Sequence, residues 1–343
     1  MLDTSMILLG IGLAISFFVA MALGANDAAT PTDCAVGAGI ISVRKAILLF
    51  AIFTGLGAGL QGHMVIKTIG KGITPSVNLI GALISSIVAG SWVIFCSWRG
   101  LDISVTYASI GSVIGYGIAE YGIEGINKNV IQNILLSWLF SPFCSMTVSY
   151  TIYKIILKIL YNKAWSERIQ KIFSALLIMS LCFSAYSFGA NDVGNATGVY
   201  VTVAEKVGRM PDQTAMFMLA MLGAVGIAVG GFIWGKNVIE TVAFRITRID
   251  ILMGFAAELG NALVVYIFTT IPYMLFGFGL PISTSVASDG SIIGVGLAKS
   301  YKSINFRTVA RLVITWILTV PITAFLSGSI YLLVTNLFGK SLL

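Results

Sequence analysis

Two copies of the tetrapeptide Gly-Ala-Asn-Asp place a carboxylate in otherwise apolar sequence, at Asp27 and at Asp192. An ionisable residue inside a membrane segment is costly and is by default functional. Carboxylates are hard oxygen ligands of the kind that small cations prefer. We therefore predict that Asp27 and Asp192 bind a coupling cation. The alternative is that each Asp only caps a buried helix.

The residue types of the tetrapeptide also predict a local structure. Glycine lets a chain leave helical geometry, and Asn and Asp favour helix ends and turns. We therefore expect a helix break at both copies, which lie 165 residues apart. Broken helices at membrane depth occur where they line a cavity or are buried in protein.

Two stretches rich in hydroxyl groups and glycine form a second duplicated element. The sequence ISVTYASIGSVIGYG, from Ile103, aligns without gaps on ISTSVASDGSIIGVG, from Ile282. The runs after the hydroxyl groups are short for a membrane span, so we expect half-helices or re-entrant hairpins. A helix N-terminus with added hydroxyl donors favours an anion, although small residues also serve helix packing. The candidate anion-binding hydroxyl residues are Ser104, Thr106, Ser283, Thr284 and Ser285.

The composition places these motifs in a membrane protein. The 343 residues are 57% hydrophobic and 10% charged, with a mean hydropathy of +0.95, whereas a soluble domain carries about 25% charged residues. Runs near or above the spanning length of about 20 residues recur from end to end. They cover 6–21, 79–93, 131–160, 172–188, 251–268 and 312–338.

The same sequence argues against other classes. It contains no HExxH, GxSxG or Walker pattern, so we expect no enzyme and no primary pump. The basic residues are scattered between apolar segments rather than clustered for nucleic acid. The four cysteines are isolated without metal-ligand spacing, and we expect them to be packing residues.

The repeated motifs divide the chain into two halves, 1–160 and 161–343. The largest basic cluster, around Lys158, lies between them and predicts a cytoplasmic loop. The scarcity of Lys and Arg at both termini places both ends outside, so each half crosses an odd number of times. The predicted fold is an all-α, multi-pass helical bundle in the cell membrane. It has two inverted-topology repeats with broken or re-entrant helices, as in many secondary transporters.

With these residues in place, the chain resembles the inorganic phosphate transporter family known as PiT over nearly its whole length. GANDAATPTDCAVGAG from Gly24 and GANDVGNATG from Gly189 resemble its two signatures, and LPISTS from Leu280 resembles its hydroxyl segment. The resemblance implies inverted repeats, external termini, and phosphate uptake driven by sodium or protons. It adds Asn26 and Asn191 to the candidate phosphate site. It adds Asn195, Glu240 and Thr30 to the candidate cation site.

The chain also departs from that family pattern. Lys67 stands where a Glu is usual, Asp102 replaces a proline, and Thr30 replaces an Asn. Tyr107 and Val286 replace the histidine of the hydroxyl motif. The two halves are therefore not equivalent, and the second copy matches the family better.

These observations predict a secondary active transporter that imports inorganic phosphate by sodium symport with alternating access. Sodium is favoured because His63 is the only histidine of the chain. Proton coupling and the transport of another oxyanion or a metal–phosphate complex remain alternatives, and an ion channel is the alternative from another class. The expected partners are phosphate, sodium and the lipid bilayer, with no other cofactor. The sequence leaves open whether the chain works alone or as a homodimer.

Overall fold

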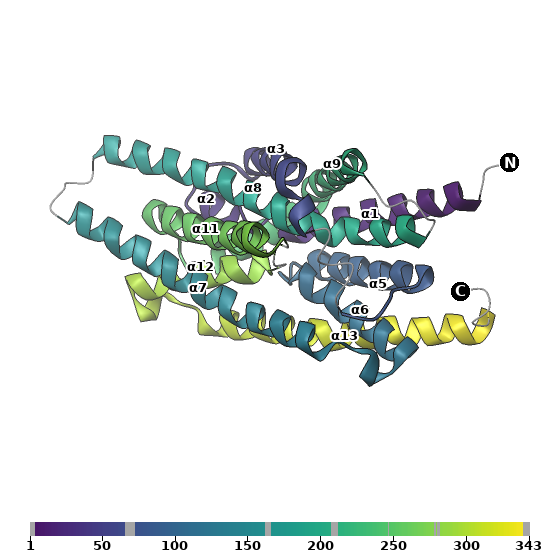
Figure 1. The fold of residues 1–343 in the computed structure, drawn as a ribbon. Helices are drawn as coiled ribbons and strands as arrows, with labels where there is room; N and C mark the ends of the chain where they lie inside the picture. Colours follow the sequence, from purple (N-terminus) through teal and green to yellow (C-terminus); the bar gives the residue numbers. More distant parts are fainter. Residues whose placement is uncertain are drawn as a thin grey trace.

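The computed structural model describes residues 4–65, 73–161, 166–206, 212–245, 247–277, 279 and 282–338, and within these ranges all regular structure is helical (Figure 1). The first half contains α1 (Thr4–Asp27), α2 (Asp33–Gly37), α3 (Val43–Gln61), α5 (Leu79–Trp98), α6 (Val105–Tyr121), the short η1 (Ile123–Gly125) and α7 (Lys128–Leu160). The second contains α8 (Glu167–Lys206), α9 (Gln213–Gly230), the π-turn η2 (Gly231–Gly235), α10 (Lys236–Arg245), α11 (Ile251–Phe276), α12 (Thr284–Lys299), the short η3 (Tyr301–Ser303) and α13 (Phe306–Phe338).

Eight helical stretches within the described ranges are long and apolar enough to cross a membrane. They are α1, α3, α5, α7, α8, α11, α13 and the run from α9 into α10. Each of the six apolar runs predicted from the sequence lies inside one of them. The predicted multi-pass helical bundle is therefore confirmed. The two hydroxyl-rich helices, α6 and α12, are shorter and are not among the eight.

The last long helix of each half packs on the hydroxyl-rich helix of the other half. Helix α7 lies along α12 and α11, and α13 lies along α6 and α5. The first helices are exchanged in the same way, because α1 packs on α9 and α8 packs on α3. The halves are thus interlocked in space, and the chain passes from one to the other between α7 and α8.

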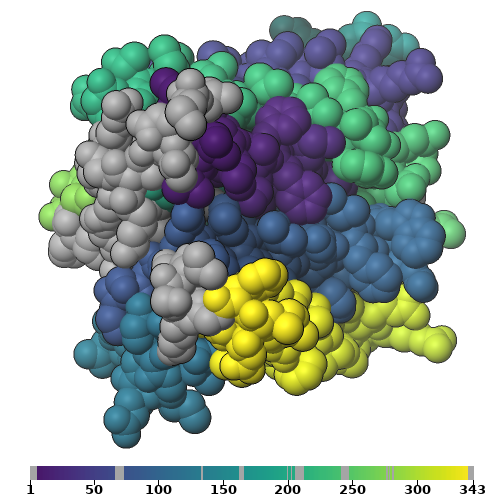
Figure 2. Space-filling view, turned by 90° about the vertical axis from the view of Figure 1, so that its right-hand side faces the viewer, coloured from purple at the N-terminus to yellow at the C-terminus, as the bar shows by residue number. Residues whose placement is uncertain are grey.

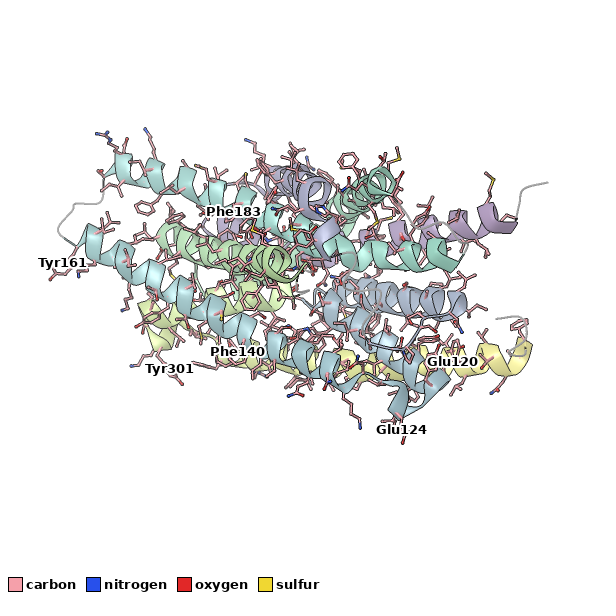
Figure 3. The ribbon with its side chains drawn as sticks, viewed as in Figure 1. Glu120, Glu124, Phe140, Tyr161, Phe183 and Tyr301 are labelled. Atoms are coloured by element: carbon pink, nitrogen blue, oxygen red, sulfur yellow. The ribbon has the colours of Figure 1, made fainter. Side chains whose placement is uncertain are left out.

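Equivalent points of the two halves lie toward opposite ends of the bundle. The beginning of α1 and the end of α13 share one end, as Figure 2 shows face-on, and the connection between α7 and α8 lies at the other (Figure 1). The short helices η1 and η3 follow α6 and α12 in the same way, yet their residues Glu124 and Tyr301 lie toward opposite ends (Figure 3). This placement is compatible with inverted repeats, which stay a prediction.

Glycines at matching positions let these helices approach closely. Gly115 of α6 faces the Ala324 carbonyl of α13, and Gly294 of α12 faces the Met146 carbonyl of α7. A Cβ at either glycine would overlap the facing oxygen. Each glycine follows another four residues earlier, which gives the Gly-xxx-Gly spacing typical of close helix pairs in membranes.

We predict that Gly115→Leu or Gly294→Leu lowers the thermal unfolding midpoint of the detergent-purified protein. Overpacking lowers the free energy of unfolding by about 1–3 kcal/mol. Here the added side chain would meet backbone atoms, which cannot move away by changing rotamer. Gly10→Leu is the matched control, since nothing lies within 4 Å of a Cβ at that position. Equal midpoints for all three variants would contradict the packing argument.

Candidate functional site

The two carboxylates of the repeated tetrapeptides are buried, and both are 1% exposed. Asp27 is the last residue of α1, whereas Asp192 lies in the middle of the continuous helix α8. The predicted helix break is therefore confirmed in the first copy and wrong in the second. The reason is local: Pro31 follows the first Asp, and Ala196 stands at the matching position of the second. Proline lacks the N–H that a continuing helix needs and disfavours helix at the preceding residue.

The glycine of each tetrapeptide serves close packing between the halves. Gly24 of α1 lies against the Ile227 carbonyl of α9, and Gly189 of α8 lies against the Thr54 carbonyl of α3. A Cβ at either glycine would overlap these backbone oxygens. The glycine is thus needed in both copies, including the one in which the helix does not break.

The first asparagine, Asn26, binds within its own half. Its amide nitrogen donates to Ser97 Oγ at 3.0 Å and to the Leu101 carbonyl at 2.9 Å. Its carbonyl oxygen accepts from the Ile103 N–H at 3.1 Å. These bonds hold the end of α1 against the segment that leads into α6, so Asn26 positions the first hydroxyl motif.

The second asparagine makes a comparable bond in its own half. Asn191 donates from Nδ2 to Thr269 Oγ1 of α11 at 2.7 Å. Each Asn precedes an Asp of the candidate site in the sequence, but in this arrangement the two amide protons of Asn26 are already used. Direct phosphate binding by Asn26 and Asn191 therefore stays a prediction.

The aspartates, in contrast, lie beside the hydroxyl motifs. Asp27 faces the motif of the opposite half, whereas Asp192 lies close to Thr284 of its own half and reaches the opposite motif through Asn195. Ser285 at the beginning of α12 donates from Oγ to Asp27 Oδ1 at 3.1 Å. In the reciprocal position, Asn195 Nδ2 lies 3.1 Å from Asp192 Oδ1 and 3.2 Å from Thr106 Oγ1 of α6. The structure thus brings these five sequence-predicted residues together in two crossed contacts.

Both hydroxyl-rich helices begin at their motifs with buried N-termini. Ser104 caps α6 by accepting from the Tyr107 N–H at 3.2 Å, and Ser283 caps α12 by accepting from the Val286 N–H at 3.3 Å. Each cap uses a lone pair and leaves the hydroxyl proton free to donate. The first N–H groups of each helix have no partner inside the helix. The predicted half-helices are therefore confirmed as two short helices whose donor-rich ends are buried.

Two further predicted residues have side-chain oxygens ready for a ligand. The Thr30 hydroxyl oxygen is buried and has no hydrogen-bond partner among the described residues, and the buried Thr284 hydroxyl lies close to the Asp192 carboxylate. The Thr30 backbone carbonyl accepts from Ser288 Oγ at 3.1 Å, which ties the turn after α1 to α12. Buried polar atoms without partners are uncommon and point to water or a bound ion.

Glu240 lies apart from this buried group. Its side chain is 50% exposed and pairs with Lys236 at 3.7 Å, one helical turn away in α10. Its assignment as a cation ligand gains no support from this arrangement and stays a prediction. Lys67, the departure at the expected Glu position, lies outside the described residues.

Three comparisons with known proteins agree on the family. Residues 23–327 match the profile described as "Phosphate transporter family". The chain belongs to the phosphate transporter family. It is 28% identical to "Putative phosphate permease TK2061" of Thermococcus kodakarensis, covering 94% of this chain and 96% of that one. It is 26% identical to a "Putative phosphate permease" of Haemophilus influenzae, covering 94% and 96%.

A solved structure titled "The sodium-dependent phosphate transporter" matches with a TM-score of 0.86 and 28% identity, covering 97% of this chain and 100% of that one. Sequence similarity and structural similarity therefore both support the family assignment and the all-helical fold. The chain is a transporter and not an enzyme, as the sequence predicted.

The residues that replace the family's histidine in this phosphate transporter lie in an apolar cluster. Tyr107 stacks on Trp138 with ring centroids 3.7 Å apart and an interplanar angle of 23°. Val286 and Trp316 belong to the same buried cluster. Neither position offers a group that titrates near neutral pH.

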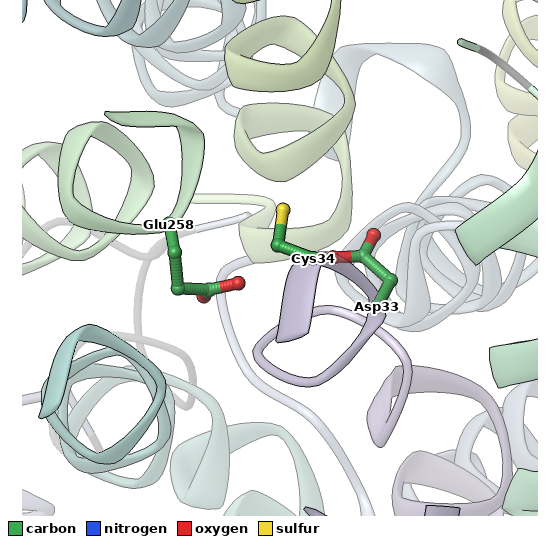
Figure 4. Close-up of side chains that lie close together, drawn as sticks. All are labelled: Asp33, Cys34 and Glu258. Carbon is green, nitrogen blue, oxygen red and sulfur yellow. The ribbon is translucent and has the colours of Figure 1, made fainter. Parts of the chain in front are cut away.

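Sequence reasoning missed a set of buried acids beside the crossed contacts. Asp33 and Cys34 begin α2, Glu258 lies on α11, and the three side chains converge (Figure 4). Asp102 and Asp289 are also buried and lie within electrostatic range of Asp33. The available signal was the Asp-Cys pair within the first signature, but Cys34 was expected to be a packing residue.

We predict that Ser285→Ala and Thr106→Val each weaken phosphate uptake about tenfold or more, because each removes a hydroxyl that would donate to phosphate, and a hydrogen bond to a charged group contributes about 1.5–3 kcal/mol. The measurement is the initial rate of radiolabelled phosphate uptake in proteoliposomes against phosphate concentration. Thr147→Val is the matched control, since Thr147 is exposed and bonds only to the Phe143 carbonyl of its own helix. Wild-type kinetics in Ser285→Ala and Thr106→Val would remove the crossed contacts from the transport site.

Proposed function

We propose that this phosphate transporter imports inorganic phosphate together with sodium, by alternating access between two inverted repeats. The observation that carries the proposal is the pair of crossed contacts. Asp27 meets the hydroxyl motif of the second half, and Asp192 meets that of the first through Asn195. A substrate held there contacts both halves at once, so a relative movement of the halves would change its exposure.

The anion side of the site is formed by the beginnings of α6 and α12. Hydroxyl protons and the first helix N–H groups supply donors without a buried Lys or Arg. In the described ranges, no ion pair involves Asp27 or Asp192. Phosphate and carboxylates of like charge repel strongly in a medium of low dielectric constant. Phosphate therefore needs a cation beside these carboxylates in order to bind.

Sodium is the cation that these ligands fit. The side chains around the two acids offer carboxylate, amide and hydroxyl oxygens, which are hard ligands. The apolar surroundings of Tyr107 and Val286 supply no proton-carrying histidine at the motif. The similarity to a structure titled as sodium-dependent supports the same choice.

The opposed positions of η1 and η3 support the inverted arrangement. In the proposed orientation the beginning of α1 and the end of α13 face outward, and the basic connection between α7 and α8 faces the cytoplasm. A transporter of this kind opens its central site alternately to the two sides.

The deciding experiment imposes sodium and proton gradients separately on proteoliposomes containing the purified chain. We expect radiolabelled phosphate to accumulate with an inward sodium gradient and not with a proton gradient alone. Accumulation with protons only would assign the coupling to protons. A flux that does not saturate and follows phosphate down its own gradient would indicate a channel.

The aspartates are tested in the same vesicles. Asp27→Asn and Asp192→Asn should each lower sodium-driven uptake about tenfold or more, because each removes a charged cation ligand. Glu124→Gln, an exposed acid in η1, is the control and should retain normal uptake. Full sodium-coupled uptake in both Asp variants would remove their assigned role.

A further inference from the structure

We propose that Asp33, Cys34 and Glu258 form a second cation site, which binds a divalent transition-metal ion of the zinc class. The site is distinct from the proposed sodium ligands Asp27 and Asp192, and it includes a sulfur ligand that they lack. It does not depend on the proposed sodium coupling.

The geometry of the three side chains fits a shared ion. One carboxylate oxygen of Asp33, the Cys34 Sγ and one carboxylate oxygen of Glu258 all lie within 4.8 Å of one another. In a tetrahedral zinc site with bonds of about 2.0–2.3 Å, ligand atoms lie about 3.3–3.8 Å apart. Small side-chain adjustments therefore bring the three atoms into coordinating positions. Figure 4 shows the Glu258 carboxylate reaching from α11 toward the two residues of α2.

The burial of these groups calls for a partner. The side chains of Asp33, Cys34 and Glu258 are at most 1% exposed. No hydrogen bond of full geometry reaches the carboxylate oxygens of Asp33 or Glu258 among the described residues. The nearby donors are neutral ones, Cys34 beside both acids and Ser184 beside Glu258. A buried carboxylate is costly unless positive charge lies beside it, and these neutral donors do not supply that charge. A divalent ion satisfies the oxygens and neutralises both acids at once.

The surrounding charges also favour a divalent ion. Asp102 and Asp289 lie within electrostatic range of Asp33 and would add further negative charge when ionised. None of the ion pairs found in the described ranges involves any of these acids. Among the described residues, no basic side chain forms an ion pair that would offset this charge.

The sulfur atom selects the class of metal. Sodium, magnesium and calcium prefer oxygen ligands, whereas zinc and its neighbours readily accept a thiolate together with carboxylates. Three protein ligands leave a fourth position for water or another ligand. Because α2 follows Asp27 directly in the chain and Glu258 lies on α11, a bound ion would link the turn after α1 to the second half.

Cobalt is the spectroscopic probe that tests the site. The full-length protein, purified in detergent with chelator and then dialysed, is titrated with Co²⁺. We expect one ion per chain, with a near-ultraviolet thiolate-to-cobalt charge-transfer band, and displacement by Zn²⁺ but not by Mg²⁺ or Na⁺. Cys34→Ser should abolish the band and lower the Co²⁺ affinity at least about tenfold, since loss of a supporting outer ligand alone costs 10–100-fold.

Cys96→Ser is the matched control, because Cys96 is also buried, at 2% exposed, but lies in α5 outside the cluster. It should keep both the band and the affinity. Asp33→Asn and Glu258→Gln should keep the thiolate band at saturation but need more Co²⁺, which tests the site if Cys34→Ser does not fold. No Co²⁺ binding by the unmodified protein, an unchanged band in Cys34→Ser, or equal competition by Mg²⁺ would overturn the proposal. The titration contains no phosphate, so its result is separate from that of the transport assay.

Discussion

The structure depends on the burial of two carboxylates, Asp27 and Asp192, that no basic side chain in the described ranges neutralises. The protein meets each with neutral donors, the Ser285 hydroxyl on one side and the Asn195 amide on the other. Neutral donors lower the cost of burial without cancelling the charge. That remaining negative charge would make the proposed site responsive to a small cation, and a bound cation would in turn make an adjacent anion tolerable. An Arg or Lys in the same place would have satisfied the acids permanently and removed that dependence.

Such contacts across the two halves require the backbones to lie very close together. The repeated glycines meet this requirement at matching positions: Gly24 and Gly189 beside the aspartates, and Gly115 and Gly294 on the hydroxyl helices. The exchange of α7 and α13 between the halves supports the same arrangement, because each covers the short helix that carries the other half's donors. Close packing and chemistry are therefore coupled, since widening a helix pair would also lengthen the hydrogen bonds at its end.

Much of this architecture could be predicted from local sequence. The long apolar runs, the capped half-helices and the grouping of the duplicated acids with the hydroxyl motifs follow from composition and repetition. The different roles of Asn and Asp within the tetrapeptide could not be predicted. Whether Asn26 bonds to its own half or to a ligand depends on where Ser97 and Ile103 lie in space. The continuity of α8 could have been predicted locally, because Ala196 stands where the first copy has Pro31 and permits the helix to continue. The meeting of Cys34 with Glu258 joins distant parts of the chain and is set only by the packing of α2 on α11.

The buried acids without a counterpart in the other half differ in their electrostatic role from the duplicated pair. Asp27 and Asp192 match across the repeats, but Asp33, Asp102 and Asp289 stand opposite Gly198, Pro281 and Ile110 at the corresponding positions. A function shared by both halves cannot explain charges that only one half carries. Those acids lie near one another around a cysteine at the beginning of α2, and no described basic residue pairs with them. Their burial requires positive charge beyond what the duplicated pair requires, and the thiol among them favours a softer ion than the one that the oxygen ligands of the transport site prefer.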